Sequence, residues 1–146
     1  MTPFRLQKVL EYRNVLENMA KLSLAKAQNR QVSIESEMQQ TLQQKQELQC
    51  AVRTRQTDAM DAREIPLFEA RIQHLTRRHN VLAEQLQQAR LDTLARRQEL
   101  VQAAQKKKAL ERLKEKKIEE EVLSQKRRDT AVLDEIAGQK HWRHSS

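Results

Sequence analysis

The residues of this chain that could perform chemistry are few, and their spacing does not bring them into one reactive site. The four histidines are His74, His79, His141 and His144. His74 and His79 are five residues apart and share a helix face poorly, and no cysteine pair or carboxylate cluster with metal-ligand spacing accompanies them. Cys50, the single cysteine, would need a histidine beside it in space to act as a nucleophile. We therefore predict no catalytic residue, no metal site and no cofactor, and a protein that is not an enzyme.

A basic cluster is the strongest charged feature of the sequence. It consists of Lys106, Lys107, Lys108, Arg112, Lys114, Lys116 and Lys117. Glu111 and Glu115 interrupt it, and with Glu119 they climb one helix face at i,i+4 spacing. The commonest meaning of such a run is a solvated helix face, and the functional alternative is a docking surface for an acidic protein. Nucleic acid is not expected as a partner, because no zinc pattern, aromatic platform or reading motif accompanies the net charge of +8.

The composition predicts an all-α protein. The chain has 146 residues with one glycine and two prolines. Both residue types mark turns, and phosphate-binding loops are rich in glycine, so we expect few turns and no such loop. The residues that dominate it, Gln, Glu, Lys, Arg, Leu and Ala, are good helix formers. The sequence has no apolar run suited to a signal peptide or to the roughly 18 residues of a membrane span, and one cysteine cannot form an intramolecular disulfide. We therefore expect a cytosolic protein, which could sit at a membrane through a partner.

Apolar residues recur along the first third of the chain at alternating steps of four and three, the seam pattern of a left-handed coiled coil. Nine of the fourteen positions on this line are apolar. The line runs through Leu6, Leu10, Arg13, Glu17, Ala20, Leu24, Ala27, Gln31, Ile34, Met38, Thr41, Lys45, Leu48 and Val52. Val9, Leu16, Met19, Leu22 and Leu42 lie beside it and are expected to widen the stripe. We predict a helix over residues 3–55, with Thr2 as its cap and Pro3 in its first turn.

The pattern is interrupted between Thr54 and Pro66, where large apolar residues are few. Asp61 and Glu64 are spaced as in a capping box, and Pro66 fits the first turn of a helix. We predict a hairpin turn at residues 56–64. Because this turn has no glycine, an uninterrupted helix is the alternative.

A second line with the same spacing begins after the turn, and nine of its thirteen positions are apolar. It runs through Phe68, Ile72, Leu75, His79, Leu82, Leu86, Ala89, Thr93, Arg96, Leu100, Ala103, Lys107 and Leu110. After an extra step, as at a stutter, it resumes with Leu113, Ile118, Val122, Val132, Leu133 and Ile136. We predict a helix over residues 65–137 that ends at Gly138, a loose tail over 138–146, and a single coiled-coil domain over 1–146.

The two helices are expected to fold back as an antiparallel two-helix coiled-coil hairpin of unequal arms. At about 1.5 Å per residue the first would measure about 75 Å and the second about 110 Å. Part of the second helix must then extend past the first or find another partner. At the turn end, Phe68, Ile72 and Leu75 are the bulkiest residues. Such residues usually pack in the seam, and the functional alternative is a hydrophobic anchor for a partner.

Several stretches, taken in order along the chain, carry a resemblance to a known family. The opening Phe4–Arg13, followed by Leu16-Glu17 and Leu24–Ala27, resembles the N-terminus of FliJ, the small coiled-coil protein of the flagellar type III export apparatus. The later stretches Lys107–Glu115 and Leu133–Ala137 resemble the C-terminal half of that family. The similarity spans nearly the whole chain.

The resemblance implies an antiparallel hairpin like the central stalk of rotary ATPases, located in the cytoplasm and peripherally at the inner membrane of the flagellar base. It implies that the end with both termini enters the ring of the hexameric export ATPase (FliI) and stimulates it. It also implies contact with the membrane export gate protein (FlhA) and with export chaperones. At the gate we expect Phe68, Ile72 and Leu75. For the ATPase ring, position and charge suggest Leu6, Leu10, Arg13, Leu113, Lys117 and Arg128.

Three alternatives remain open at this point. The first is the equivalent stalk of a virulence-type secretion system, which has the same form and role. The second is a basic coiled coil associated with nucleic acid, whose binding would weaken with salt. The third is a long parallel dimer without a turn, in which labels at residues 5 and 135 would lie near 200 Å apart, at about 1.5 Å per residue.

Overall fold

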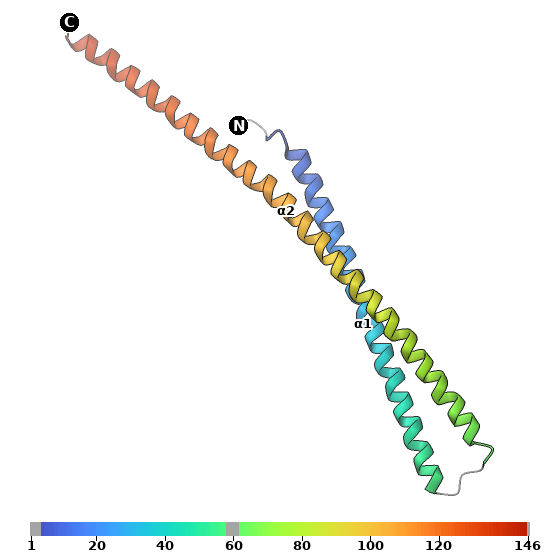
Figure 1. Ribbon diagram of the computed structural model, residues 1–146. Helices are drawn as coiled ribbons and strands as arrows, with labels where there is room; N and C mark the ends of the chain where they lie inside the picture. The colour runs from blue at the N-terminus through green and yellow to red at the C-terminus, as the bar shows by residue number, and fades with distance from the viewer. Residues whose placement is uncertain (1–3, 58–61, 146) are drawn as a thin grey trace. The chain divides into compact units, whose positions relative to one another are not determined.

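The computed structural model is an all-α helical hairpin, as the sequence predicts, and it describes residues 4–57 and 62–145. Helix α1 spans Gln7–Thr57 and helix α2 spans Ile65–Ser145 (Figure 1). The predicted turn over 56–64 overlaps the connection between the helices, of which residues 58–61 lie outside the described residues. The expected cap at Thr2 and Pro3 lies outside them too.

Both helix starts follow from local chemistry. Pro66 lies in the first turn of α2, where its missing N–H removes no helical hydrogen bond, and the amide of Phe68 donates to the carbonyl of Glu64 at 3.1 Å. At the start of α1, the amide of Gln7 donates to the carbonyl of Phe4 at 3.0 Å. The helix therefore begins at Gln7, four residues later than predicted, and Leu6 lies in a turn in front of it.

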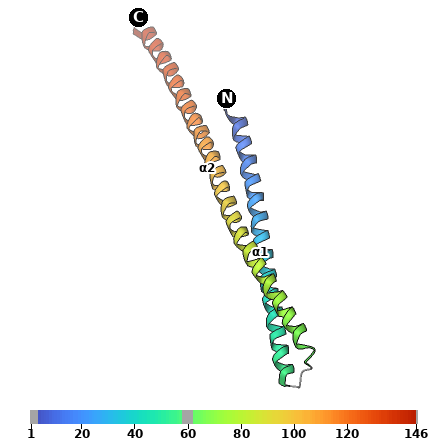
Figure 2. The ribbon, with the colours of Figure 1, turned by 45° about the vertical axis from the view of Figure 1, so that its right-hand side comes forward.

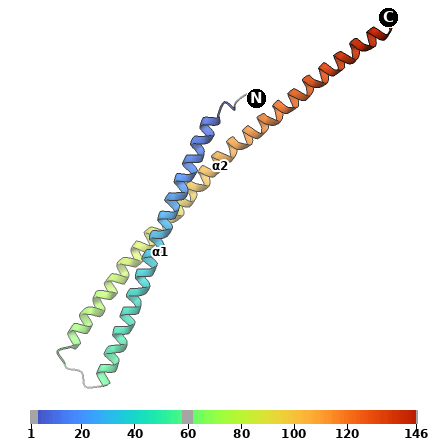
Figure 3. The ribbon, with the colours of Figure 1, turned by 180° about the vertical axis from the view of Figure 1, so that it is seen from behind.

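The chain forms two compact units, residues 18–101 and residues 1–17 together with 102–146. In the first unit, α1 and α2 run antiparallel from the connection onward, as the three views agree (Figures 1, 2 and 3). Every seam position predicted from 20 to 52 and from 68 to 100 is buried or half-buried. The two predicted lines therefore form the interface between the helices in this unit.

The core of the first unit is one small cluster between the two helices. Ile34 and Met38 of α1 pack with Leu82, Leu86 and Ala89 of α2, and Leu82 is only 1% exposed. Coiled-coil packing explains this, because each seam side chain inserts between residues of the facing helix. Because the cluster is small, the stability of this unit depends on few side chains.

The two buried polar residues in the seam of this unit, both threonines, are satisfied locally. The buried hydroxyls of Thr41 and Thr93 donate to the carbonyls of Glu37 at 2.8 Å and Ala89 at 2.9 Å, each one helical turn earlier. Arg78 also bonds to Glu37 across the interface at 3.0 Å, with both side chains about half exposed. An exposed pair of this kind contributes little free energy, so the apolar seam is the main source of stability.

The expected widening of the first stripe is wrong for most of its members. Val9, Met19, Leu22 and Leu42 are exposed, and only Leu16 is half-buried. A helix in a two-helix hairpin has a single neighbour, which covers a narrow seam and leaves the flanking positions in solvent.

In the second unit, residues 4–17 pack beside α2 between Lys107 and Lys117. Lys107 Nζ lies 3.5 Å from Glu17 Oε2, and the side chains are 24% and 12% exposed. These two predicted seam positions form a partly buried ion pair. Such a pair aligns two helices through its geometry as well as its attraction.

Replacing Glu17 with Gln should lower the free energy of unfolding by about 1 kcal/mol, because Lys107 then loses its partner on α1 and keeps only Glu111, 3.9 Å away on its own helix. The double variant Glu17→Leu with Lys107→Leu should recover most of that loss, since an apolar pair fits a coiled-coil seam. Urea unfolding followed by circular dichroism measures both. A double variant less stable than the single one would contradict this account.

The predicted stutter beyond Leu110 is wrong. The half-buried positions of α2 after Leu110 continue the unbroken spacing, in a series that includes Lys114, Lys117, Glu121 and Ser124. Leu113, Ile118 and Val122, the apolar residues that suggested an extra step, are exposed. The backbone keeps its regular phase because it is already set by the seam before Leu110, and the apolar residues are left uncovered.

The predicted helix end at residue 137 is also wrong, because α2 continues through Gly138 to Ser145. Residues 125–143 are all exposed, and the tail expected to be loose is helical through Ser145. Glycine disfavours a helix interior without forbidding it, and no left-handed backbone marks Gly138 as a terminus.

Replacing Gly138 with Ala should stabilise this end of α2 by about 0.5–1 kcal/mol, the usual helical preference of Ala over Gly. An added Cβ meets no atom within 4 Å, so no clash opposes the gain. Slower amide hydrogen exchange at residues 134–142 is the expected result. Unchanged or faster exchange would mean that the helix ends before Gly138 in solution.

Candidate partner-binding surfaces

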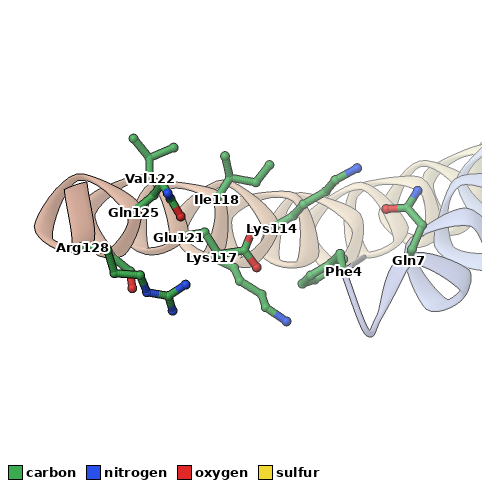
Figure 4. A pocket seen from close by; sticks show the side chains of 10 residues that line it. Phe4, Gln7, Lys114, Lys117, Ile118, Glu121, Val122, Gln125 and Arg128 are labelled. Atoms are coloured by element: carbon green, nitrogen blue, oxygen red, sulfur yellow. The ribbon is translucent and has the colours of Figure 1, made fainter. Parts of the chain in front are cut away.

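A groove lies within the second unit, between Phe4 and Gln7 at the start of α1 and the facing part of α2. It has a volume of about 830 Å³ and runs along α2 as far as Arg128. Its lining includes Phe4, Gln7, Lys114, Lys117, Ile118, Glu121, Val122, Gln125 and Arg128 (Figure 4). The groove combines residues from the start of the chain with a stretch of the regular face of α2.

The walls of the groove combine apolar and basic side chains. Ile118 and Val122 project from one side of α2, and Lys117 and Arg128 project from the other (Figure 4). The Nζ atom of Lys117 lies 5.9 Å from the centre of the Phe4 ring, within reach of a cation–π contact. An open surface of this kind is suited to an amphipathic helix that carries acidic residues.

A smaller groove, of about 440 Å³, also involves Phe4. It is lined by Phe4, Arg5, Leu6, Leu113, Lys116, Lys117 and Glu120. Phe4 and Lys117 belong to both grooves. The described start of the chain therefore forms part of a basic, apolar surface along α2.

All six residues suggested for an ATPase ring lie in this second unit. Lys117 and Arg128 line the larger groove, and Leu6 and Leu113 line the smaller one with Lys117. Leu10 and Arg13 are half-buried and line neither groove. The structure thus brings four of the six together at the grooves and leaves two at the seam.

The three residues suggested for a gate contact lie in the first unit, at the start of α2. Leu75 is buried, and Phe68 and Ile72 are half-buried. The guanidinium of Arg55 lies 5.7 Å from the centre of the Phe68 ring and bonds to Glu64 at 2.9 Å. Leu75 therefore serves packing, while part of the Phe68 ring remains accessible.

Sequence reasoning did not single out Phe4, Leu67, Ile118 or Val122 as surface residues. Leu67 is one of the most exposed apolar residues at the start of α2, because it precedes the seam position of Phe68. The surface that Phe4 forms with Ile118 and Val122 depends on which part of α2 lies beside the start of α1, and helix periodicity does not give this. The signal in the sequence was the greater length of the second helix.

Among residues 4–57 and 62–145, no group of three or more His, Cys, Asp or Glu side chains could hold a metal ion. Cys50 is exposed, with a free thiol. No helix within the described ranges has the length and apolar character needed to cross a membrane.

These features define a class of protein: a coiled-coil helical hairpin with long exposed helix surfaces and two open grooves along α2. The family model described as the flagellar FliJ protein matches residues 1–146, the whole chain, and the chain belongs to this family. It is therefore related to flagellar protein export. No curated protein shows a significant match, and no solved structure does either.

Proposed function

We propose that the chain is a non-enzymatic stalk and adaptor of the flagellar type III export apparatus. The unit that carries both termini inserts into the ring of the hexameric export ATPase and stimulates it. The other unit contacts the export gate membrane protein, and the exposed helix faces receive export chaperones. The site of action is the cytoplasmic side of the inner membrane at the flagellar base. Membership of the FliJ family supports this proposal.

The observation that carries the proposal is the uncovered part of α2. Residues 125–143 are helical and exposed throughout, and they include Val132, Leu133 and Ile136. Helices in proteins gain most of their stability from packing, and exposed aliphatic side chains favour burial against a partner. A binding partner that surrounds this segment would stabilise it.

The mechanism follows from symmetry and charge. A single helix inside a six-fold ring cannot contact six identical subunits equally, so it favours different nucleotide states in different subunits. A ligand that prefers one state shifts the population toward it, which promotes assembly and turnover of the ring. The basic side chains along α2 would steer the segment toward acidic surfaces of the ring and speed association.

The proposal is tested by titrating the full chain into the purified export ATPase while ATP hydrolysis is followed, with a pull-down under the same conditions. The expected result is a saturable rise in hydrolysis together with co-purification of both proteins. Absence of both binding and stimulation would refute the proposal. Binding without stimulation would support the adaptor role of the chain and refute its role as an activator of the ATPase.

Replacing Phe68 with Ala should weaken binding to the cytoplasmic linker of the export gate by roughly tenfold, because accessible aromatic side chains are common binding hot spots. Val32→Ala, at an exposed position in the same unit, is the matched control and should bind normally. Fluorescence anisotropy of the labelled linker measures both. Equal binding by both variants would exclude Phe68 from the contact.

A further inference from the structure

We propose that residues 118–140 of α2 pair with the same segment of a second copy in a parallel coiled coil. This inference does not depend on the proposed function, since it concerns how the chain associates with itself. It rests on three properties of the segment: an uncovered apolar line, the signs of the charges beside that line, and a polar layer at its centre.

The uncovered line has coiled-coil spacing of its own. Its positions, at alternating steps of four and three, are Ile118, Val122, Gln125, Asp129, Val132 and Ile136. The four aliphatic members are 44–54% exposed, and all six project from one stripe of the helix by their spacing. Two apolar layers therefore lie on each side of a polar centre formed by Gln125 and Asp129.

The charges beside this line favour a second copy in parallel orientation. In a parallel pair, the residue directly before Val122 or Ile136 faces the residue five places further along the partner helix. Glu121 then faces Lys126 of the second copy, and Glu135 faces Lys140. Symmetry makes each attraction occur twice.

The same charges disfavour the antiparallel alternative. With the aliphatic layers matched in that orientation, Lys126 and Arg128 each face their own counterpart in the second copy, and Glu121 faces Glu135. All three contacts join like charges, which are destabilising across helices. The sequence therefore selects orientation as well as partner.

The polar centre sets the strength of the association. Gln125 Nε2 donates to Asp129 Oδ1 at 3.2 Å within one helix, so the middle of the line is already hydrogen-bonded. Two aspartates facing each other in a parallel pair repel, which makes the dimer weak and reversible. Because Ile118 and Val122 also line the groove, the dimer covers a surface that a partner helix would use.

The test is sedimentation equilibrium of the full chain carrying Cys50→Ala, with and without charge changes, up to roughly 100 μM to detect a weak interface. Glu121→Lys alone and Lys126→Glu alone should each weaken self-association about tenfold, because each replaces two attractive pairs with two repulsive ones. An equimolar mixture of the two variants should recover dimers, since both pairs in the mixed dimer are then attractive. A chain that stays monomeric, or a mixture that does not recover, overturns the proposal.

Orientation is tested in the same Cys50→Ala background. Val132→Cys should form an interchain disulfide under mild oxidation, because equivalent residues meet only in a parallel pair. A preference for crosslinks in a chain carrying both Val122→Cys and Val132→Cys, with none in Val132→Cys alone, would mean an antiparallel pair and overturn the inference. Asp129→Leu should strengthen the dimer at least tenfold, and a weaker dimer would place the interface elsewhere.

Discussion

A chain that ends at residue 109 is expected to lose its stimulation of the export ATPase, even though it keeps all of the first unit. The deletion removes both groove-forming segments of α2, including Lys117 and Arg128, together with the uncovered helix that follows. If that segment is what enters the ring, no surface remains to contact the subunits. The measurement is the rate of ATP hydrolysis as the truncated chain is titrated into the ATPase.

Two further truncations separate loss of folding from loss of contact. A chain that ends at residue 117 keeps the Glu17–Lys107 ion pair and the paired part of the second unit, so its helical content per residue should stay near normal, while stimulation should still be lost. A chain that ends at residue 137 keeps the groove and should retain most of the stimulation. Full stimulation by the chain that ends at residue 109 would contradict the proposed role of this unit.

Replacing Leu82 with Ala is expected to destabilise the hairpin by about 2–5 kcal/mol, the usual range for removing a buried leucine side chain. Leu82 is 1% exposed and lies within the small cluster that includes Ile34 and Leu86. Because the cluster is small, few neighbouring side chains can move to fill the cavity, so the loss should be near the upper end of the range. Thermal unfolding followed by circular dichroism would show a large drop in the midpoint.

The matched control for this substitution is Leu91→Ala on the same helix. Leu91 is 61% exposed, so removing its side chain leaves no cavity and should change the free energy of unfolding by less than about 0.5 kcal/mol. Similar midpoints for the two variants would mean that α1 and α2 do not pack through the line containing Leu82. The comparison therefore tests the register of the seam as well as its stability.

The seam could be predicted from the sequence because apolar spacing and coiled-coil geometry are directly linked. Steps of four and three keep side chains on one face, so even polar members such as Thr41, Thr93 and Lys107 were placed correctly against the neighbouring helix. The connection near Pro66 was also predictable, since proline suits the first turn of a helix.

The features that escaped prediction depend on how far the neighbour reaches. Met19 and Leu22 look like core residues in sequence and are exposed because a single neighbour covers only a narrow seam. The spacing of Ile118 and Val122 suggested a shifted seam, but Lys117 and Glu121 take the half-buried positions there and leave both aliphatic residues exposed. Gly138 suggested a helix end, although glycine in a helix costs only about 1 kcal/mol relative to alanine.

The groove could not be predicted from the sequence either, because it also depends on which part of α2 the other arm covers. Its position requires knowing that Phe4 lies beside Lys114 and Lys117, residues more than a hundred positions further along the chain. Periodicity predicts which face of a helix is covered, and it does not give the level at which one arm ends against the other. The antiparallel register of the two helices determines which α2 residues lie beside Phe4.

Site-specific photo-crosslinking in the complex with the export ATPase determines which unit of the chain contacts the ATPase subunits. A photoreactive side chain is placed at Val122, in the larger groove of the second unit, or at Leu67, an exposed position at the start of α2 in the first unit. If the second unit enters the ring, adducts with ATPase subunits form from position 122 and none form from position 67. Adducts from position 67 with none from position 122 would show that the ATPase holds the other unit.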